Sequence, residues 1–192
     1  MERGGILRET EAKLLEMKNT SELMLDLAYS ALIYNHRAIA EEVVDLENRI
    51  DYLYEEVQRN SLNRYKETGN YDRALIFMKV ADAVERIADA ALDIADVVLR
   101  DIEVHPVLRQ SLEDADIIML KKQVQAGSML DERSLGQVKL ASETGLWVIA
   151  IKRGNKWIYG PNEKTIVRKG DILFARGPVD SENILDAWTT VK

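Results

Sequence analysis

The sequence predicts a protein of class α + (α+β), an antiparallel three-helix bundle followed by a small α+β domain. Charged residues and glycines are both distributed unevenly between the two halves of the chain. Residues 1–106 hold 13 basic and 22 acidic side chains, whereas residues 107–192 hold 13 basic and 11 acidic ones. Gly69 is the only glycine between residues 6 and 126, and seven glycines fall between residues 127 and 177. We therefore expect an acidic helical domain over residues 1–105 and a turn-rich domain over residues 106–192.

The helical domain is predicted from apolar residues that recur in alternating steps of three and four. This spacing places each series in one stripe of a helix, as in the seam of a bundle or coiled coil. A first, less regular helix is expected over about residues 6–34, ended at Asn35 and His36. Gly69 ends the second helix. The two regular series are Ile39, Val43, Leu46, Ile50, Leu53, Val57 and Phe77, Val80, Val84, Ile87, Ala91, Ile94, Val98. We expect both stripes to lie inside the bundle.

The second domain is predicted from shorter apolar runs separated by turn residues. His105 and Pro106 mark its start, because a residue before proline is biased away from helix. A short helix over 107–114 comes first. Ser134 is a candidate N-cap for a helix over 135–143, and Asp180 or Ser181 for a closing helix that ends near residue 189. Strands are expected over residues 116–124, 146–152, 156–159, 165–167 and 172–175.

Composition excludes several classes of function. The chain has no cysteine, so disulfides, thiolate metal sites and cysteine nucleophiles are excluded, and two histidines argue against a His-rich zinc centre. No apolar run approaches the roughly 18 residues needed to span a bilayer. The pI near 5 and the interleaving of basic with acidic residues argue against nucleic-acid binding. No nucleophile–base arrangement or nucleotide loop is visible, so we expect no enzyme.

Residues of the second half resemble the TrkA-C family, the regulatory C-terminal (RCK C-terminal) domain of potassium-transport gating proteins. The matching segments follow the order and spacing of that family. They are Gly127–Leu130, Ser134-Leu135, Val148–Gly154, Pro161, Lys169–Leu173 and Gly177.

Residues of the first half resemble PhoU-like domains, in the segments Ala40–Asp51 and Ala83–Ala91. The combination resembles two-domain prokaryotic, archaeal-type proteins related to potassium channels. This resemblance implies a cytoplasmic regulator, usually a homodimer, that senses a small anionic ligand and acts on a membrane cation transporter or channel subunit. Cyclic di-AMP is a ligand of some TrkA-C domains, and PhoU domains can bind metal. A dinucleotide-binding glycine turn has no place in a sequence with so few glycines before residue 127, so NAD or ATP in the usual family site is not expected.

Acidic residues four apart on the second and third helices form a candidate divalent-metal site. Residues at this spacing share a helix face, and like charges there are mildly unfavourable without a cation. Carboxylate oxygens suit Mg²⁺, Ca²⁺ or Mn²⁺. The alternative is a solvated acidic face neutralised by Arg49 and Arg86. The candidate ligands are Glu47, Asp51, Asp82, Glu85 and Asp89.

A cationic rim in the second domain forms a candidate site for a phosphate-bearing ligand. If the hairpin after residue 152 and the turn at residues 168–170 share one rim, four cations and several free backbone amides converge there. The alternative is ordinary edge-strand charge. The candidate residues are Lys152, Arg153, Asn155, Pro161, Arg168 and Lys169.

Three functions remain open from the sequence. The first is a ligand-sensing regulator of cation transport, potassium above all, that works through a dimeric TrkA-C domain. The second is a PhoU-type metal-binding regulator of phosphate or other transport. The third is an adaptor that binds no small ligand. The three tryptophans, Trp147, Trp157 and Trp188, are expected in the core or a dimer contact, or as a surface on which a purine stacks.

Overall fold

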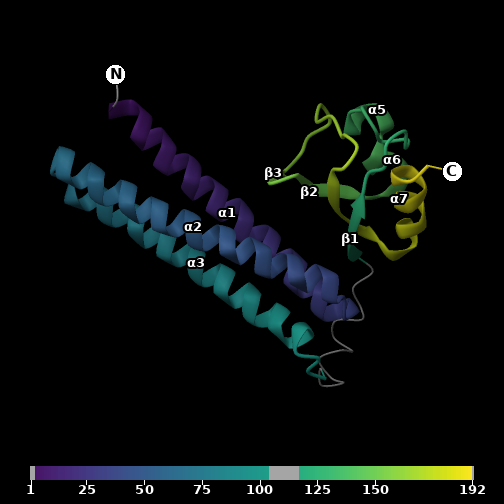
Figure 1. Ribbon diagram of the computed structural model, residues 1–192, viewed down its shortest axis with the longest axis horizontal. Helices are drawn as coiled ribbons and strands as arrows, with labels where there is room; N and C mark the ends of the chain where they lie inside the picture. The colour runs from purple at the N-terminus through teal and green to yellow at the C-terminus, as the bar shows by residue number, and fades with distance from the viewer. Residues whose placement is uncertain (1–2, 104–116, 192) are drawn as a thin grey trace. The chain divides into compact units, whose positions relative to one another are not determined.

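A computed structural model describes residues 3–103 and 117–191 of the chain. The chain divides into two compact units, residues 1–104 and 105–192 (Figure 1). The predicted boundary at His105 and Pro106 and the predicted helix over 107–114 lie outside the described residues. None of the described helices combines the length and the apolar character that crossing a membrane requires.

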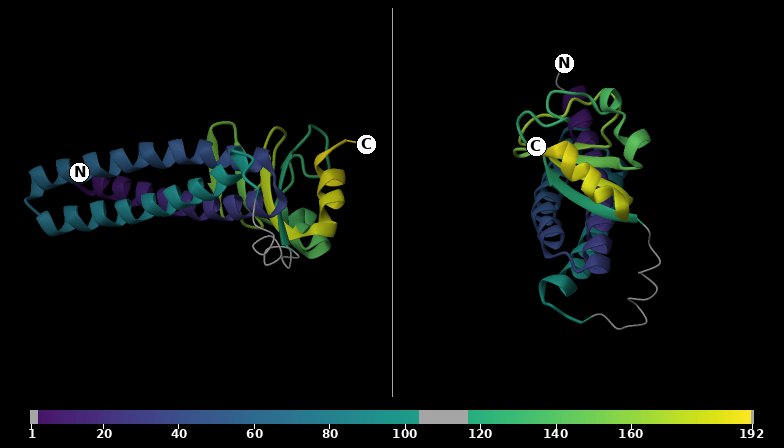
Figure 2. Two further views of the ribbon diagram at one scale, coloured as in Figure 1. Left: turned by 90° about the horizontal axis from the view of Figure 1, so that it is seen from below. Right: turned by 90° about the vertical axis from the view of Figure 1, so that its right-hand side faces the viewer.

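The first unit is a bundle of three helices that run alongside one another (Figure 2). They are α1 (Arg3–Tyr34), α2 (Arg37–Thr68) and α3 (Tyr71–Leu99). Asn35, with φ of 48°, turns the chain between the first two helices. Gly69 ends α2 in the left-handed conformation, with φ of 68°, and its N–H donates to the Tyr65 carbonyl. The antiparallel three-helix bundle expected from the sequence is confirmed.

The heptad stripe of α2 is the core of this bundle. All six residues of the predicted series, from Ile39 to Val57, are buried. The prediction for α3 was wrong in part, since Val80 and Ile87 are each 46% exposed. The buried face of α3 consists instead of small residues, because alanine lets the helix backbones approach closely. This face is Ala74, Ala81, Ala88, Ala91, Ala95 and Val98.

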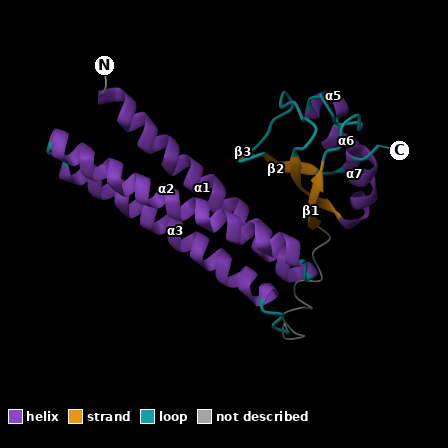
Figure 3. Cartoon of the chain, in the orientation of Figure 1, coloured by secondary structure: helices purple, strands orange, loops and turns teal. Residues whose placement is uncertain are grey.

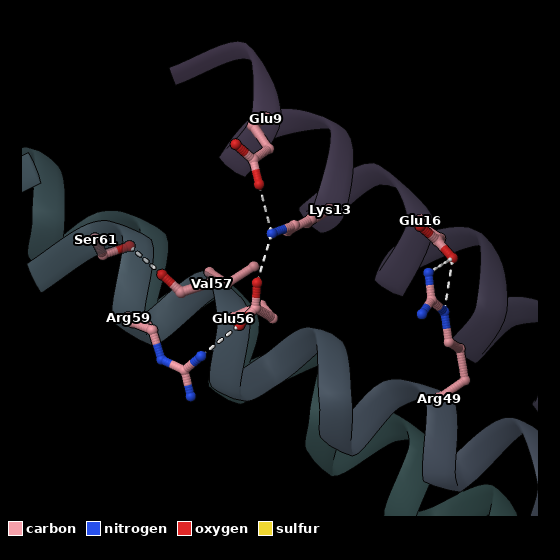
Figure 4. Close-up of polar contacts among 8 residues, drawn as sticks. All are labelled: Glu9, Lys13, Glu16, Arg49, Glu56, Val57, Arg59 and Ser61. Carbon is pink, nitrogen blue, oxygen red and sulfur yellow. Dashed lines mark hydrogen bonds and ion pairs between the residues drawn. The ribbon is translucent and has the colours of Figure 1, made fainter. Parts of the chain in front are cut away.

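Two ion-pair groups join α1 to α2 (Figure 4). The Lys13 ammonium lies 2.7 Å from a Glu9 carboxylate oxygen and 2.8 Å from one of Glu56. The Arg49 guanidinium donates twice to Glu16 Oε1, at 2.9 and 2.6 Å. Arg49 thus neutralises a carboxylate of α1.

The second unit is a four-stranded antiparallel sheet with short helices (Figure 3). The spatial strand order is β1-β4-β2-β3. The strands are β1 (Ile117–Gln123), β2 (Trp147–Arg153), β3 (Lys156–Tyr159) and β4 (Ile172–Pro178). The predicted strand at 165–167 forms only an isolated bridge, between Ile166 and Ser134.

The helices of this unit are α5 (Leu135–Val138), α6 (Leu140–Thr144) and α7 (Glu182–Thr189), the last preceded by a 3-10 turn, η1 (Val179–Ser181). Ser134 caps α5 through a reciprocal capping box with Gln137, as predicted. Lys139, with φ of 52°, splits the predicted single helix into α5 and α6. Ser181 precedes α7 without a side-chain cap, because its hydroxyl donates to the Thr144 carbonyl at 2.6 Å.

One face of the sheet packs against these helices to form the core of the unit. Leu120, Ile151 and Leu173 from the strands are buried together with Leu140 from α6 and Leu185 from α7. At the edge of this core, Lys122 of β1 pairs with two acids of α7, Glu182 at 3.0 Å and Asp186 at 2.8 Å.

Candidate functional site

The acidic residues predicted as metal ligands face one another across α2 and α3. Burial and neighbouring negative charges together raise the pKa of Glu47 from an ordinary 4.5 to about 7. Burial is the largest cause, followed by the charges on Asp51 of the same helix and on Asp89 and Glu85 of α3. The structure therefore brings these side chains within electrostatic reach of each other.

Glu85 shares the environment of Glu47. Its pKa is raised first by burial and then by Asp89, Asp51 and Asp82, while Arg86 opposes the shift. Arg86 itself is paired with Asp82 at 3.0 Å, as its spacing predicted. The cluster thus holds more negative charge than its nearby arginine compensates.

The Glu47 carboxylate is the unusual member of this cluster. Only 9% of the residue is exposed, and its Oε2 atom is buried without a hydrogen-bond partner. A buried carboxylate oxygen without a partner is costly when charged. Within the described residues, however, no three His, Asp or Glu side chains lie close enough together to hold a metal ion. As placed, these carboxylates form a strained acidic cluster, and the metal site stays a prediction.

The structure brings two residues of the predicted cationic rim, Arg153 and Arg168, to the carboxylate of Asp171. Arg153, at the end of β2, donates from Nε and from a terminal nitrogen to the two carboxylate oxygens, at 2.8 and 2.7 Å. The same guanidinium donates to the Ile166 carbonyl at 2.7 Å. Asp171 is buried, and its hydrogen bonds from the Arg153 guanidinium, together with its charge, raise the pKa of Arg153. Arg153 is therefore held in a bidentate ion pair inside the unit.

The expectation of free backbone amides at the 168–170 turn was wrong. The Arg168 N–H donates to Asp171 at 2.9 Å, and the Lys169 N–H donates to Asp131 at 2.8 Å. The Gly170 N–H donates to the Val124 carbonyl. Hydrogen bonds from the Gly127 and Lys169 amides lower the pKa of Asp131. Two carboxylates of the chain occupy the positions that an anionic ligand was expected to take.

The other predicted ligand-binding residues lie at separate places. Lys152 lies over the Trp157 ring, 5.4 Å from its centroid, in a cation–π contact. Asn155 lies in the turn between β2 and β3. Pro161 lines a cavity away from that turn.

That cavity has a volume of about 550 Å³ and lies in the second unit. Its walls come from α5 and α6, the start of β2, and the loop after β3. Apolar residues of the lining include Leu135, Trp147 and Val148, and polar ones include Lys139, Ser142, Glu143, Asn162 and Glu163. Such a volume and mixture suit a small organic molecule with polar groups. A ligand in this cavity would displace none of the ion pairs described above.

A close backbone contact shapes this cavity. The Gly136 N–H donates to the Glu163 carbonyl at 2.8 Å, and a Cβ at residue 136 would lie 2.8 Å from that same oxygen. Only glycine lets α5 approach the loop this closely. Trp147, at the first position of β2, is 69% exposed and lines the cavity.

The sequence placed Pro161 on the cationic rim, whereas the structure places it in this cavity, and Lys139 and Ser142 were not predicted as ligand-binding residues. Its three walls are distant in sequence, so no local motif marks them. A tryptophan at the exposed start of a strand is the one signal that pointed here, through the possibility of stacking on a purine.

Two family models match the chain. The PhoU domain matches residues 14–98, and the TrkA-C domain matches residues 123–187. No protein with a curated description matches the chain.

Several solved structures are similar to it. One is the RCK_C domain dimer of S. agalactiae BusR in complex with c-di-AMP, at 21% identity and a TM-score of 0.36, covering 39% of this chain and 93% of that one. Another is the RCK C domain of the potassium transport protein KtrA in complex with cyclic diadenosine monophosphate, at 27% identity and a TM-score of 0.34, covering 42% and 93%. A third is the GsuK RCK domain, at 13% identity and a TM-score of 0.34, covering 56% and 24%.

Proposed function

Because this chain joins a PhoU domain to a TrkA-C domain, we propose that it is a regulatory protein of cation transport that senses a small ligand. Potassium is the first candidate for the transported ion, since TrkA-C is the regulatory domain that the sequence resembles. The chain acts by binding, without catalysing a reaction. Its ligand shifts the population of two conformations, and only a ligand with different affinities for the two can do so.

The observation that carries this proposal is the 550 Å³ cavity in the TrkA-C unit. Its Trp147 ring offers an exposed flat surface on which a nucleobase can stack. Lys139, between α5 and α6 on another wall of the cavity, supplies a cation for a phosphate group, in a lining that also contains Glu143 and Glu163. A phosphate-bearing nucleotide such as cyclic di-AMP meets both requirements, and this cavity replaces the cationic rim as the proposed ligand site.

Thermal stability in the presence of single nucleotides tests the proposal. The probes are cyclic di-AMP, ATP and NAD, with potassium and sodium chloride as separate arms. A ligand at 100 times its dissociation constant stabilises the folded state by about 2.7 kcal/mol. For the second unit, residues 105–192, that corresponds to a rise in melting temperature of roughly 10–20 °C. If none of these probes changes the melting temperature, the sensing function is contradicted.

Tryptophan variants locate the binding site. Trp147→Phe is expected to remove most of the fluorescence change that a bound nucleotide causes. Trp157→Phe is the matched control, because Trp157 stacks against Tyr159 and Phe174 outside the cavity lining. An equal loss of signal in both variants would place the ligand elsewhere.

The remaining parts of the proposal concern partners and location. We propose that the chain forms a homodimer, acts on a membrane transporter or channel subunit, and is cytoplasmic, reaching the membrane through that partner. Co-purification with the transporter encoded beside its gene tests the partner. A stable monomer at micromolar concentration, with and without nucleotide, would contradict the dimer.

A second candidate function is favoured by the buried, unpartnered oxygen of Glu47. In this alternative the helical unit binds a divalent cation through Glu47, Asp51, Asp82, Glu85 and Asp89, and the TrkA-C unit serves for dimerisation. The bound cation would supply positive charge to a cluster in which burial and neighbouring carboxylates raise the pKa of Glu47 and of Glu85.

Metal analysis of protein purified without chelator tests this alternative. We expect Mn²⁺ or Mg²⁺ to raise the melting temperature of the helical unit, and we expect Glu85→Gln to abolish that effect. Glu55→Gln, at an exposed position of α2, is the control. The metal function would be ruled out if the purified protein contained no metal and added cations left its melting temperature unchanged.

A further inference from the structure

Helix α3 carries a second heptad series that the bundle leaves on the surface. Its residues step four, three, four, three, four, three along the helix. Ile76 is 60% exposed, and the last two members are half-buried. The series is Ile76, Val80, Ala83, Ile87, Ala90, Ile94 and Val97.

This exposed series is distinct from the face that α3 uses inside its own bundle. The bundle buries Ala74, Ala81, Ala88 and Ala95, which are spaced by seven residues. Heptad spacing that continues over three consecutive repeats is typical of a helix that packs against a partner helix. The α3 helix has two such seams, and its own chain covers one of them.

Charged residues border the exposed seam at one heptad position. All five are exposed. Three of them, at positions 79, 86 and 93, immediately precede Val80, Ile87 and Ile94 of the seam, and the other two lie just beyond its ends. Their signs run negative, positive, positive, negative, positive along the helix. The five residues are Asp72, Lys79, Arg86, Asp93 and Arg100.

This order of charges is complementary to itself when two copies of α3 run in opposite directions. Around a twofold axis at Arg86, Lys79 of each copy faces Asp93 of the other, seven residues from the axis. Asp72 faces Arg100 in the same way, fourteen residues from it. Only the two Arg86 side chains meet as like charges, and each is already paired with Asp82 of its own helix at 3.0 Å. Flanking charges of this kind set the partner and orientation of paired helices.

The sizes of the seam residues agree with this antiparallel alignment. In it, Val80 faces Ala90 of the second copy, and Ile87 faces Ala83, so the core layers are centred on residue 85, one residue before the Arg86 position on which the flanking charges are centred. A large side chain thus meets a small one in each central layer, which favours close packing. In a parallel pair, the charged border would instead face the apolar series that contains Phe77 and Val84.

We propose that α3 pairs antiparallel with α3 of a second copy of this chain, through the seam from Ile76 to Val97. This contact lies in the PhoU unit and is independent of any dimer contact made by the TrkA-C unit. It is also independent of the proposed sensing function, because it requires no ligand.

Cross-linking of the full-length protein tests the pairing, and the absence of cysteine makes single-cysteine variants clean probes. With a short bis-maleimide linker, Arg86→Cys is expected to form a linked dimer with itself. Lys79→Cys and Asp93→Cys are each expected to fail alone and to link when mixed. The control is Arg59→Cys, at an exposed position of α2. We expect at least tenfold more linked dimer for Arg86→Cys than for this control.

The pattern of products separates the alternatives. In a parallel pair the charged border faces the series that contains Phe77 and Val84, so Arg86→Cys would have no advantage over Lys79→Cys or Asp93→Cys, and the mixture would have none either. Linking of Arg86→Cys no greater than that of the control would overturn the pairing and leave the seam to a different partner. A failure to bind nucleotide would leave these results unchanged, so the two proposals fail separately.

Variants of the seam supply a second test. In the Arg86→Cys background, Ile87→Glu is expected to reduce linking at least tenfold. Because this substitution can also affect the helix, Lys79→Glu provides a surface alternative that sets a glutamate against Asp93. Adding Asp93→Lys to Lys79→Glu reverses both charges and is expected to restore linking. If the yield of linked dimer were the same in all of these charge variants, the antiparallel alignment would be contradicted.

Discussion

Neutralising Glu47 is expected to stabilise the helical unit above neutral pH and to have little effect in acid. The pKa of Glu47 is about 7 in the folded protein against an ordinary 4.5. A folded state that holds a proton more tightly than the unfolded state loses stability as the pH rises between these two values. Below about pH 4.5 the residue is protonated in both states and causes no such loss.

The size of the effect follows from the same two pKa values. Their difference corresponds to about 3 kcal/mol at 1.36 kcal/mol per pKa unit. Neighbours of Glu47 such as Asp51 and Asp89 are exposed, so solvent screens part of this repulsion. We therefore expect Glu47→Gln to gain about 2 kcal/mol at pH 8 and to be close to neutral at pH 4.5.

Chemical denaturation over pH 4.5–8.5 measures this difference. The chain provides an internal control, because all three tryptophans lie in the second unit while the long helices lie in the first. The far-UV circular dichroism transition should move to higher denaturant concentration in Glu47→Gln, whereas the tryptophan fluorescence transition should stay in place. Glu55→Gln, at an exposed position of the same helix, should move neither transition.

Two results would refute this reasoning. If Glu47→Gln changed stability by the same amount at pH 5 and pH 8, the effect would come from packing, not charge. If Glu47→Gln destabilised the protein at pH 8, the favourable interactions of the charged carboxylate would outweigh the free-energy cost of burying it.

Three further predictions concern the second unit, and tryptophan fluorescence during denaturation measures each. Asp171→Ala should destabilise the second unit by about 3 kcal/mol, because the substitution leaves Arg153 without its bidentate partner. A loss below about 1 kcal/mol would show that this ion pair contributes little to stability. Gly136→Ala should cost about 1–3 kcal/mol, since its Cβ would contact the Glu163 carbonyl; unchanged stability would mean that the loop moves freely. Ser181→Ala should cost about 1–2 kcal/mol through a lost buried hydrogen bond, whereas Ser181→Thr, which keeps the hydroxyl, should recover part of it if that bond is the cause.

The sequence predicted local structure well where one residue type has one conformational role. Gly69 ends α2 in the left-handed conformation, and Ser134 caps α5, because both effects depend only on neighbours in the chain. The seam of α2 was also predicted correctly. The seam of α3 was not, because α3 has a stripe of alanines beside its stripe of branched side chains, and periodicity alone favours the larger residues.

The candidate sites were predicted less well, because each depends on partners distant in the sequence. Arg153 and the turn at residues 168–170 do come together, as expected, but they converge on a carboxylate of the chain itself. Nothing in the local pattern distinguishes a cation that awaits a ligand from one paired with Asp171, eighteen residues away. The cavity beside Trp147 is built from three separate segments, and only the folded chain assembles them.

The order of apolar, glycine and charged residues was sufficient to determine two units, their helices and most of their strands, since these follow from backbone conformation and from burial of periodic faces. Only the tertiary structure decided which apolar face of α3 is buried, which member of the predicted acidic cluster is buried without a hydrogen-bond partner, and where a ligand has room. Those outcomes depend on the distances between side chains of different elements. Such distances are set by how the helices and strands pack, and local spacing along the chain does not contain them.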